Sequence, residues 1–261
     1  MSPDRVRRLA WARDVLYGTT RRAPMLNCYG LHEWAMLYRP EGESSETVSK
    51  HQGLPLRVSQ QTLNAVVEER PLRCTHTDAV RFFAPSALPL LAAFDRARVE
   101  EAAGQSVDEI ARTRGQRDAA ALILEHGKVP NRNLQPALEQ PGCVHATMDL
   151  FKWSSKLAPF VSSELIADCL HLAIQARVLD MRASPYDLRA AAECLGSEWG
   201  DFDPSPILIE TEMGRQEYVD LQLELYRSAA PVRARVLAAY DEVLSHWPEL
   251  LGQKLQPGMP K

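Results

Sequence analysis

A chain of 261 residues with 45% hydrophobic and 25% charged residues has the composition of a globular protein that can bury a core without disulfides. Its net charge of -4 excludes a general attraction to polyanions, so DNA binding would need a local basic surface. The sequence has no apolar run of about eighteen residues, so we expect no membrane span. It has no basic N-terminus followed by an apolar block, so we expect no secretion signal. Its odd number of cysteines, five, argues against a set of disulfides, so we expect a cytoplasmic location.

The first half of the chain predicts helices with little strand. Apolar spacing indicates an amphipathic helix over 4–17 with an arginine-rich outer face, and a second helix over 60–70. The alternating LPLRV at 54–58 is typical of a short strand. Residues 86–126 predict two helices that form a helical insertion.

The second half predicts longer helices. A loop rich in proline and asparagine over 128–142 precedes helices at 145–157, at 163–181 with Ser162 as its cap, and at 186–195. ILIE at 207–210 indicates a strand, and a helix over 212–246 is interrupted near Pro231. The predicted fold is mainly α: a single helix-rich domain over 1–261 with a minor β component of a few short strands.

Three short segments each combine a cysteine, a histidine and a carboxylate. They are the segments of His32 (with Cys28 and Glu33), His76 (with Cys74 and Asp78) and His145 (with Cys143 and Asp149). Thiolates, imidazoles and carboxylates bind metals and transfer protons. We expect a divalent metal, zinc or iron, with His32, His76 and His145 as candidate ligands.

The helix expected after Val144 places His145, Asp149, Lys152 and Lys156 along one face. This stripe predicts a metal site or a base with its orienting carboxylate, and its lysines suit an anionic substrate. A solvent-facing stripe with an Asp149–Lys152 ion pair is the alternative. His32 and Glu33 diverge by about 100° on a helix, so only one is expected to face the site, and Glu33 is the better acid or base.

Long motifs in the same segments resemble a bacterial, mainly actinobacterial, family labelled 3-methyladenine DNA glycosylase. The matching stretches are NCYGLHEWAMLYR (27–39), RCTHTDAVRFFAP (73–85), LQPALEQPGCVHATMDLFKW (134–153), SELIADCLHLA and ARVLDMRASPYDL (163–188), and IETEMGRQEYV (209–219). They are spread over residues 27–219 and make up about a third of the chain. Members of the family carry a further N-terminal region before the first motif, so we expect this protein to be altered or inactive if that region supplies site residues.

The resemblance implies hydrolysis of an N-glycosidic bond, with an acid/base carboxylate and a nucleobase substrate in DNA. The catalytic candidates are Glu33, His145 and Asp149. The candidate substrate contacts are Tyr29, Trp34, Arg81, Lys152, Trp153 and Lys156. Two alternatives stay open: a metal-dependent enzyme acting on a small anionic metabolite, and a non-catalytic helical interaction module.

Overall fold

The computed structural model describes residues 1–42, 54–70, 72–91, 135–195 and 203–248, and over these residues the protein is helical, as predicted. The elements are α1 (Pro3–Arg21), α2 (Leu31–Ala35), α3 (Gln60–Glu69), α4 (Thr77–Val80), the 3-10 helix η1 (Pro85–Leu90), α8 (Gln135–Leu138), α9 (Val144–Leu157), α10 (Ser163–Arg182), α11 (Leu188–Leu195) and α12 (Glu212–Ser245). The predicted helices between 92 and 126, and with them most of the predicted insertion, lie outside the described residues.

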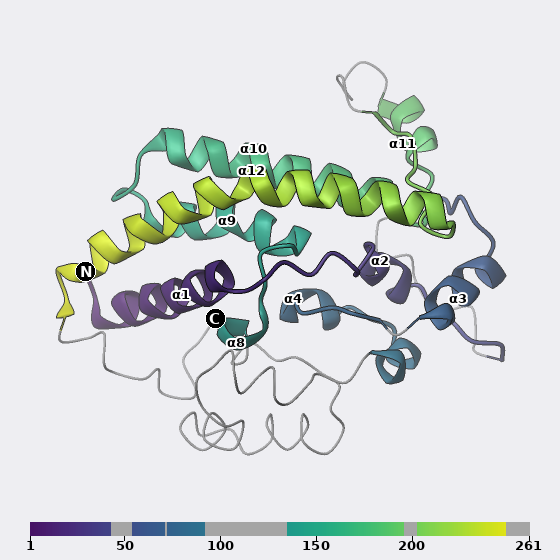
Figure 1. Ribbon diagram of the computed structural model, residues 1–261, viewed down its shortest axis with the longest axis horizontal. Coiled ribbons are helices and arrows are strands. Elements are labelled where there is room, and N and C mark those ends of the chain that lie inside the picture. Colours follow the sequence, from purple (N-terminus) through teal and green to yellow (C-terminus); the bar gives the residue numbers. More distant parts are fainter. Residues whose placement is uncertain (43–53, 71, 92–134, 196–202, 249–261) are drawn as a thin grey trace.

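Four long helices, α1, α9, α10 and α12, pack side by side and form the body of the protein (Figure 1). Their starts are specified locally, because a hydroxyl at each of three N-caps accepts a hydrogen bond from a backbone N–H of the first turn. Ser2 caps α1, Ser162 caps α10 as predicted, and Thr211 caps α12. The short helices α2, α3 and α4 lie below α12 in this view, beyond the C-terminal end of α1 (Figure 1).

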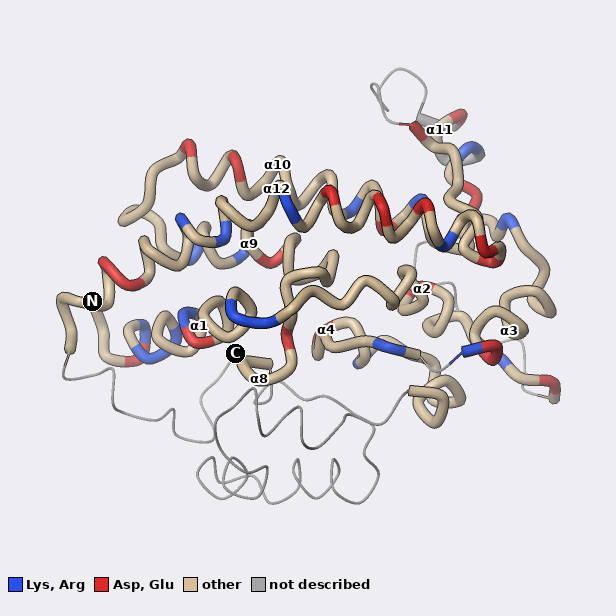
Figure 2. Tube along the Cα trace, viewed as in Figure 1, with Lys and Arg blue, Asp and Glu red and all other residues tan. Residues whose placement is uncertain are grey.

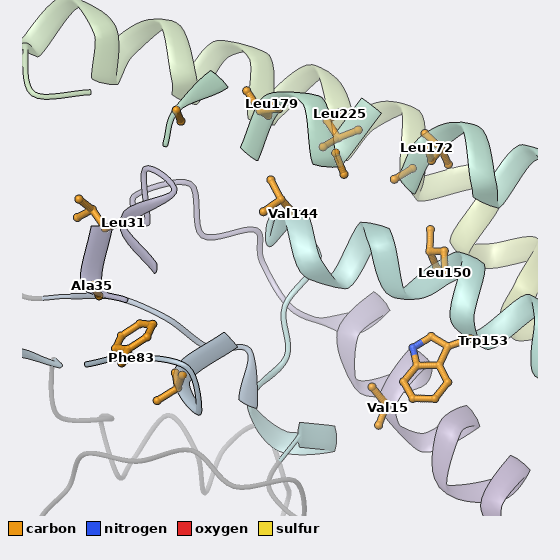
Figure 3. Packing of buried hydrophobic residues seen from close by; sticks show 14 of the residues in the cluster. Val15, Leu31, Ala35, Phe83, Val144, Leu150, Trp153, Leu172, Leu179 and Leu225 are labelled. Carbon is orange, nitrogen blue, oxygen red and sulfur yellow. The ribbon is translucent and has the colours of Figure 1, made fainter. Parts of the chain in front are cut away.

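One hydrophobic cluster joins the long helices to the short ones. Figure 3 shows Leu150 and Trp153 of α9 facing the other long helices, and Leu31 and Phe83 in the part built by the short helices. Tyr240 of α12 is fully buried and donates a hydrogen bond to the carbonyl oxygen of Trp153 over 2.9 Å. The short segments that carry histidines are therefore anchored to the same core as the bundle.

The two predicted strands do not form. Leu56 makes one isolated antiparallel bridge, to Tyr186, and a second isolated bridge joins Leu72 to Leu91; no longer ladder exists in the residues described. Ile207 and Ile209 alternate as in a strand, but both side chains are buried in the helical core. Alternation here reflects two apolar contacts in a short connection and not pairing with a second strand.

The predicted interruption of the last helix is also wrong. α12 runs without a break from Glu212 to Ser245, with Pro231 inside it. A proline in a helix interior costs about 3 kcal/mol. The packing of α12 against α1, α9 and α10 supplies the compensating contacts.

Acidic and basic residues are interspersed along the long helices (Figure 2). The arginine-rich α1 meets the acidic α12 through an ion pair between Arg13 and Asp241, 2.8 Å apart. Among the residues described, no helix combines the length and apolarity needed to cross a membrane.

Candidate metal centre

The three histidine segments meet in space. The ring of His145 lies between the other two: its centroid is 4.4 Å from that of His32, at 72°, and 5.0 Å from that of His76, stacked at 21°. The structure brings His145 and Asp149 from α9, His32 from α2 and His76 from the N-terminal end of α4 to one place. A contact among residues 32, 76 and 145 depends on tertiary packing alone.

Local structure explains how His32 reaches this position. Tyr29 and Gly30 both adopt positive φ, 49° and 68°, which turns the chain directly into α2. A Cβ atom on Gly30 would lie 3.3 Å from that of Ala183, so glycine serves both the backbone conformation and the close approach to α10. Trp34 then fixes α2, because its indole N–H donates to the carbonyl oxygen of Ala183 over 2.9 Å.

Two groups of three potential ligands result. His32, His145 and Asp180 form the first triad, and His76, Glu139 and Asp149 form the second triad; within each, the candidate ligand atoms lie within 4.8 Å of one another. The distance from His32 Nε2 to Asp180 Oδ1 is 2.9 Å. His76 Nε2 lies 3.5 Å from Asp149 Oδ2 and 3.7 Å from Glu139 Oε2.

Several of these atoms are buried without a conventional partner. His32 Nε2 and Asp180 Oδ1 lie at ion-pair distance, but within the described chain neither has a hydrogen bond of suitable geometry. Both ring nitrogens of His76 are in the same condition. Because buried polar atoms in native proteins are almost always satisfied, these atoms indicate a ligand that the side chains share.

A second residue orients each carboxylate. Arg177 donates to Asp180 Oδ2 over 2.8 Å, which leaves Oδ1 toward His32. Lys152 donates to Asp149 Oδ2 over 2.5 Å. Such outer hydrogen bonds are the usual support of metal ligands.

Glu139 has two neutral partners. Gln135 donates to its Oε2 over 2.6 Å, and Thr19 donates to its Oε1 over 3.3 Å. The carboxylate is therefore held in place without a formal positive charge in hydrogen-bond contact.

The electrostatics favour a cation. Glu33, Glu139 and Asp180 are at most 1% exposed. Arg177 pairs with Glu33 and Asp180, but its side chain is 43% exposed, which weakens the compensation. Several carboxylates in a low-dielectric interior are costly unless further positive charge joins them.

The protonation tendencies differ among the groups. Burial lowers the pKa of His145, and the nearby His32 lowers it further, so this imidazole stays neutral and keeps a lone pair for a metal. Burial opposes the charged form of His32, but Asp180 and Glu33 outweigh it and raise its pKa. Burial acts against ionisation of Asp180 too, yet His32 lowers the pKa of this carboxyl group, which stays ionised.

A small cavity opens onto the first triad only. Its volume is ≈ 20 Å³, and its walls include His32, His145 and the thiols of Cys28, Cys74 and Cys143. One water needs about 10–15 Å³ measured in this way. The three cysteines are free, and burial raises the pKa of Cys74 to about 12, so it is a protonated wall of the cavity.

An open depression lies beside this cavity. It has a volume of ≈ 430 Å³ and is lined by Pro24, Met25, Leu26, Asn27, Arg73 and Val219. Met25, Asn27 and Arg73 line both spaces, so the depression adjoins the cavity. Arg73 is exposed.

Other predicted site residues lie elsewhere. Trp34 and Trp153 are both 0% exposed and act as core residues, and neither lines the cavity. Arg81 and Lys156 are exposed; Arg81 pairs with Asp78 at 3.8 Å, and Lys156 lies over the ring of Trp153. Tyr29 is half-buried at the turn before α2.

Two expectations about neighbouring residues need revision. Adjacent residues diverge by about 100° on a helix, so we expected only one of His32 and Glu33 to face the site. Both are buried there, with His32 Nε2 and Glu33 Oε1 3.9 Å apart. α2 is a single turn, and the side chain of Glu33 is long enough to extend back toward the imidazole of His32. The Asp149–Lys152 ion pair of the alternative interpretation is present, yet Asp149 also lies against His76.

No protein-family model, curated protein or solved structure matches this chain. The geometry of the site is therefore the basis for any functional conclusion.

Sequence reasoning missed Asp180 and Glu139, one ligand of each triad. Asp180 follows Leu179 on α10, and its spacing from Leu172 and Ala176 places it on the buried face of that helix. A carboxylate on a buried helix face was the available signal. Glu139 follows the one-turn helix α8 inside a segment that is read as loop, and nothing local distinguishes it.

Proposed function

We propose that this protein is a metal-dependent enzyme whose reactive metal is held by His32, His145 and Asp180, acting on a small anionic substrate. The observation that carries the proposal is the first triad, in which the buried atoms His32 Nε2 and Asp180 Oδ1 lie 2.9 Å apart without hydrogen-bond geometry, beside a cavity. Two imidazoles and one carboxylate occupy part of a metal's coordination sphere and leave positions open.

The cavity supports chemistry on water. Space for about one water lies against His32 and His145, where an open coordination position would be. A divalent metal at such a position lowers the pKa of bound water and supplies a nucleophile at neutral pH. Glu33 Oε1 lies 3.9 Å from His32 Nε2, and this carboxylate is the acid or base candidate beside the triad, although it does not line the cavity.

The depression supports a substrate with a negative charge. Arg73 is exposed where the depression meets the cavity, and a guanidinium binds carboxylate and phosphate groups in a two-point geometry. The substrate rests in the depression with its anionic group on Arg73, and its reacting end is directed at the cavity. Four free cysteines among the described residues fit the reducing conditions of the cytoplasm.

Oxidative chemistry is a second candidate, favoured by the composition of the first triad. Two histidines and one carboxylate with open positions are the ligand set of many non-haem Fe(II) oxygenases. The identity of the bound metal separates the two: zinc favours hydrolysis, and iron favours oxidation.

Excision of an alkylated base stays a prediction with less support from the site. The cavity at the histidines is too small for a base, and the described residues in the wall of the depression include no aromatic side chain for stacking. An assay on alkylated DNA with the metal-loaded protein tests it directly.

Metal analysis of the purified protein and two variants tests the proposal. We expect His145→Ala and Asp180→Asn to lose bound metal, measured by mass spectrometry after dialysis against Zn²⁺, Fe²⁺ or Mn²⁺. The matched controls are His171→Ala and Asp168→Asn, because both residues lie on α10 away from the triads, paired with Gln175 and Arg235. A folded wild-type protein that retains none of the three metals overturns the proposal.

A further inference from the structure

The second triad is more than support for the first. His76, Glu139 and Asp149 come from three different segments, and their candidate ligand atoms also lie within 4.8 Å of one another. His76 is 2% exposed and Glu139 is 1% exposed. A buried cluster from separate segments is unlike the exposed acidic groups that occur on any surface.

The imidazole of His76 carries the strongest indication of a ligand. A neutral imidazole has one donor and one acceptor nitrogen, and both nitrogens of His76 are buried without a hydrogen bond in the described part of the chain. Its Nε2 lies 3.5 Å and 3.7 Å from the nearest oxygens of Asp149 and Glu139. These distances are too long for hydrogen bonds, but they suit three atoms arranged around one ion.

The charges around the second triad point the same way. Lys152 donates to Asp149 and lies 3.8 Å from Asp78, so one partly exposed ammonium group serves two carboxylates. Glu139 accepts only neutral donors at its side chain from the residues described.

His145 places the two triads next to each other. It belongs to the first triad, contacts the ring of His32, and stacks on the ring of His76 of the second triad. Along α9, His145 and Asp149 are one turn apart, so a single helix supplies one ligand to each triad. Paired metal sites are usually built this way, from side chains that project from shared elements.

The triads differ in access. The cavity is lined by His32 and His145, whereas no member of the second triad lines it. Catalytic metals keep an open position, and structural or supporting metals are closed by protein. The first triad therefore faces the substrate side, and the second triad lies behind it.

We infer that the protein holds a two-metal centre in which a second divalent cation, bound by His76, Glu139 and Asp149, supports the substrate-facing metal of the first triad. This inference rests on the proposed function for its first metal. The second metal neutralises Glu139 and Asp149 and, through the shared position of His145, fixes the geometry of the reactive one.

Counting metal ions in matched variants tests the inference. Purified protein is stripped with a chelator, reloaded with Mn²⁺ or Zn²⁺, and analysed for metal per chain. We expect two equivalents in the wild-type protein, one in Glu139→Gln, and two in the control His171→Ala. Glutamine keeps the shape of Glu139 and can still accept from Gln135 through its amide oxygen, and circular dichroism checks that each variant is folded.

The Mn²⁺-loaded protein gives a second readout. Two adjacent Mn²⁺ ions couple magnetically, so the wild-type electron paramagnetic resonance spectrum is that of a pair, and Glu139→Gln returns the six-line spectrum of a single ion.

The outcomes separate the two proposals. One equivalent in the wild-type protein, kept in Glu139→Gln and lost in Asp180→Asn, overturns the two-metal centre and leaves the proposed function standing. No bound metal in the wild-type protein overturns both.

Discussion

The hydrogen bond from Trp34 to Ala183 connects fold stability to the metal centre, and Trp34→Phe isolates it. Trp34 is 0% exposed, and its indole N–H donates to Ala183 over 2.9 Å. Phenylalanine leaves that carbonyl oxygen unpaired in the interior, which costs about 1–3 kcal/mol, and the smaller ring adds about 1 kcal/mol. We expect the free energy of unfolding to fall by about 2–4 kcal/mol, measured by urea denaturation.

Trp153→Phe is the matched control. Trp153 is also 0% exposed, but its indole nitrogen has no hydrogen-bond partner among the described residues, so phenylalanine removes an unsatisfied donor. The loss of ring volume destabilises the protein, whereas removal of the unsatisfied donor stabilises it. We therefore expect the free energy of unfolding to change by less than about 1 kcal/mol. Equal destabilisation by the two substitutions refutes the role assigned to the Trp34 hydrogen bond.

Three further outcomes are expected. Arg73→Gln raises the KM for an anionic substrate about tenfold with metal content unchanged, because one charge-assisted contact is lost; an unchanged KM contradicts the place given to Arg73. Burial raises the pKa of Tyr240, so the unfolded phenol ionises near its usual pKa of about 10 while the folded one keeps its proton. The contribution of Tyr240 to stability is present below about pH 10 and is lost as the pH rises above it. Tyr240→Phe removes the ionisable phenol and its hydrogen bond to Trp153, so the curve of stability against pH becomes flatter in that range. An unchanged slope contradicts the role given to Tyr240. Gly18→Ala lowers the melting temperature although alanine favours helices by about 1 kcal/mol, since its Cβ would lie 2.3 Å from the carbonyl oxygen of Pro136; an increase shows that α1 and α8 are not so close.

Helices were predictable where apolar spacing and capping agreed. The spacing around 163–181 and the cap at Ser162 match α10 closely, and Val144–Leu157 begins within a residue of its prediction. Strands were predicted at 54–58 and 207–210 but do not form. Alternation over four or five residues does not distinguish a strand from an extended connection. The interruption predicted at Pro231 was wrong for a related reason. A proline destabilises a helix locally, but tertiary contacts along α12 determine whether the helix continues.

The site was predictable in part. Residue chemistry identified His32, His76 and His145 as candidates, and the fold brings their rings into contact. Asp180 and Glu139 lie far from these histidines in sequence, and only the packing of α10 and the turn after α8 place them there. Local patterns identify reactive residue types, while the ligand sets depend on long-range contacts.

Titration of the chelator-stripped protein with a divalent metal, followed by calorimetry, tests whether Asp180 belongs to a metal centre. We expect saturable binding in the wild-type protein and in Asp168→Asn, and at least tenfold weaker binding in Asp180→Asn, as for loss of a direct ligand or its support. Equal affinity in wild-type protein and Asp180→Asn would contradict a metal centre at His32, His145 and Asp180.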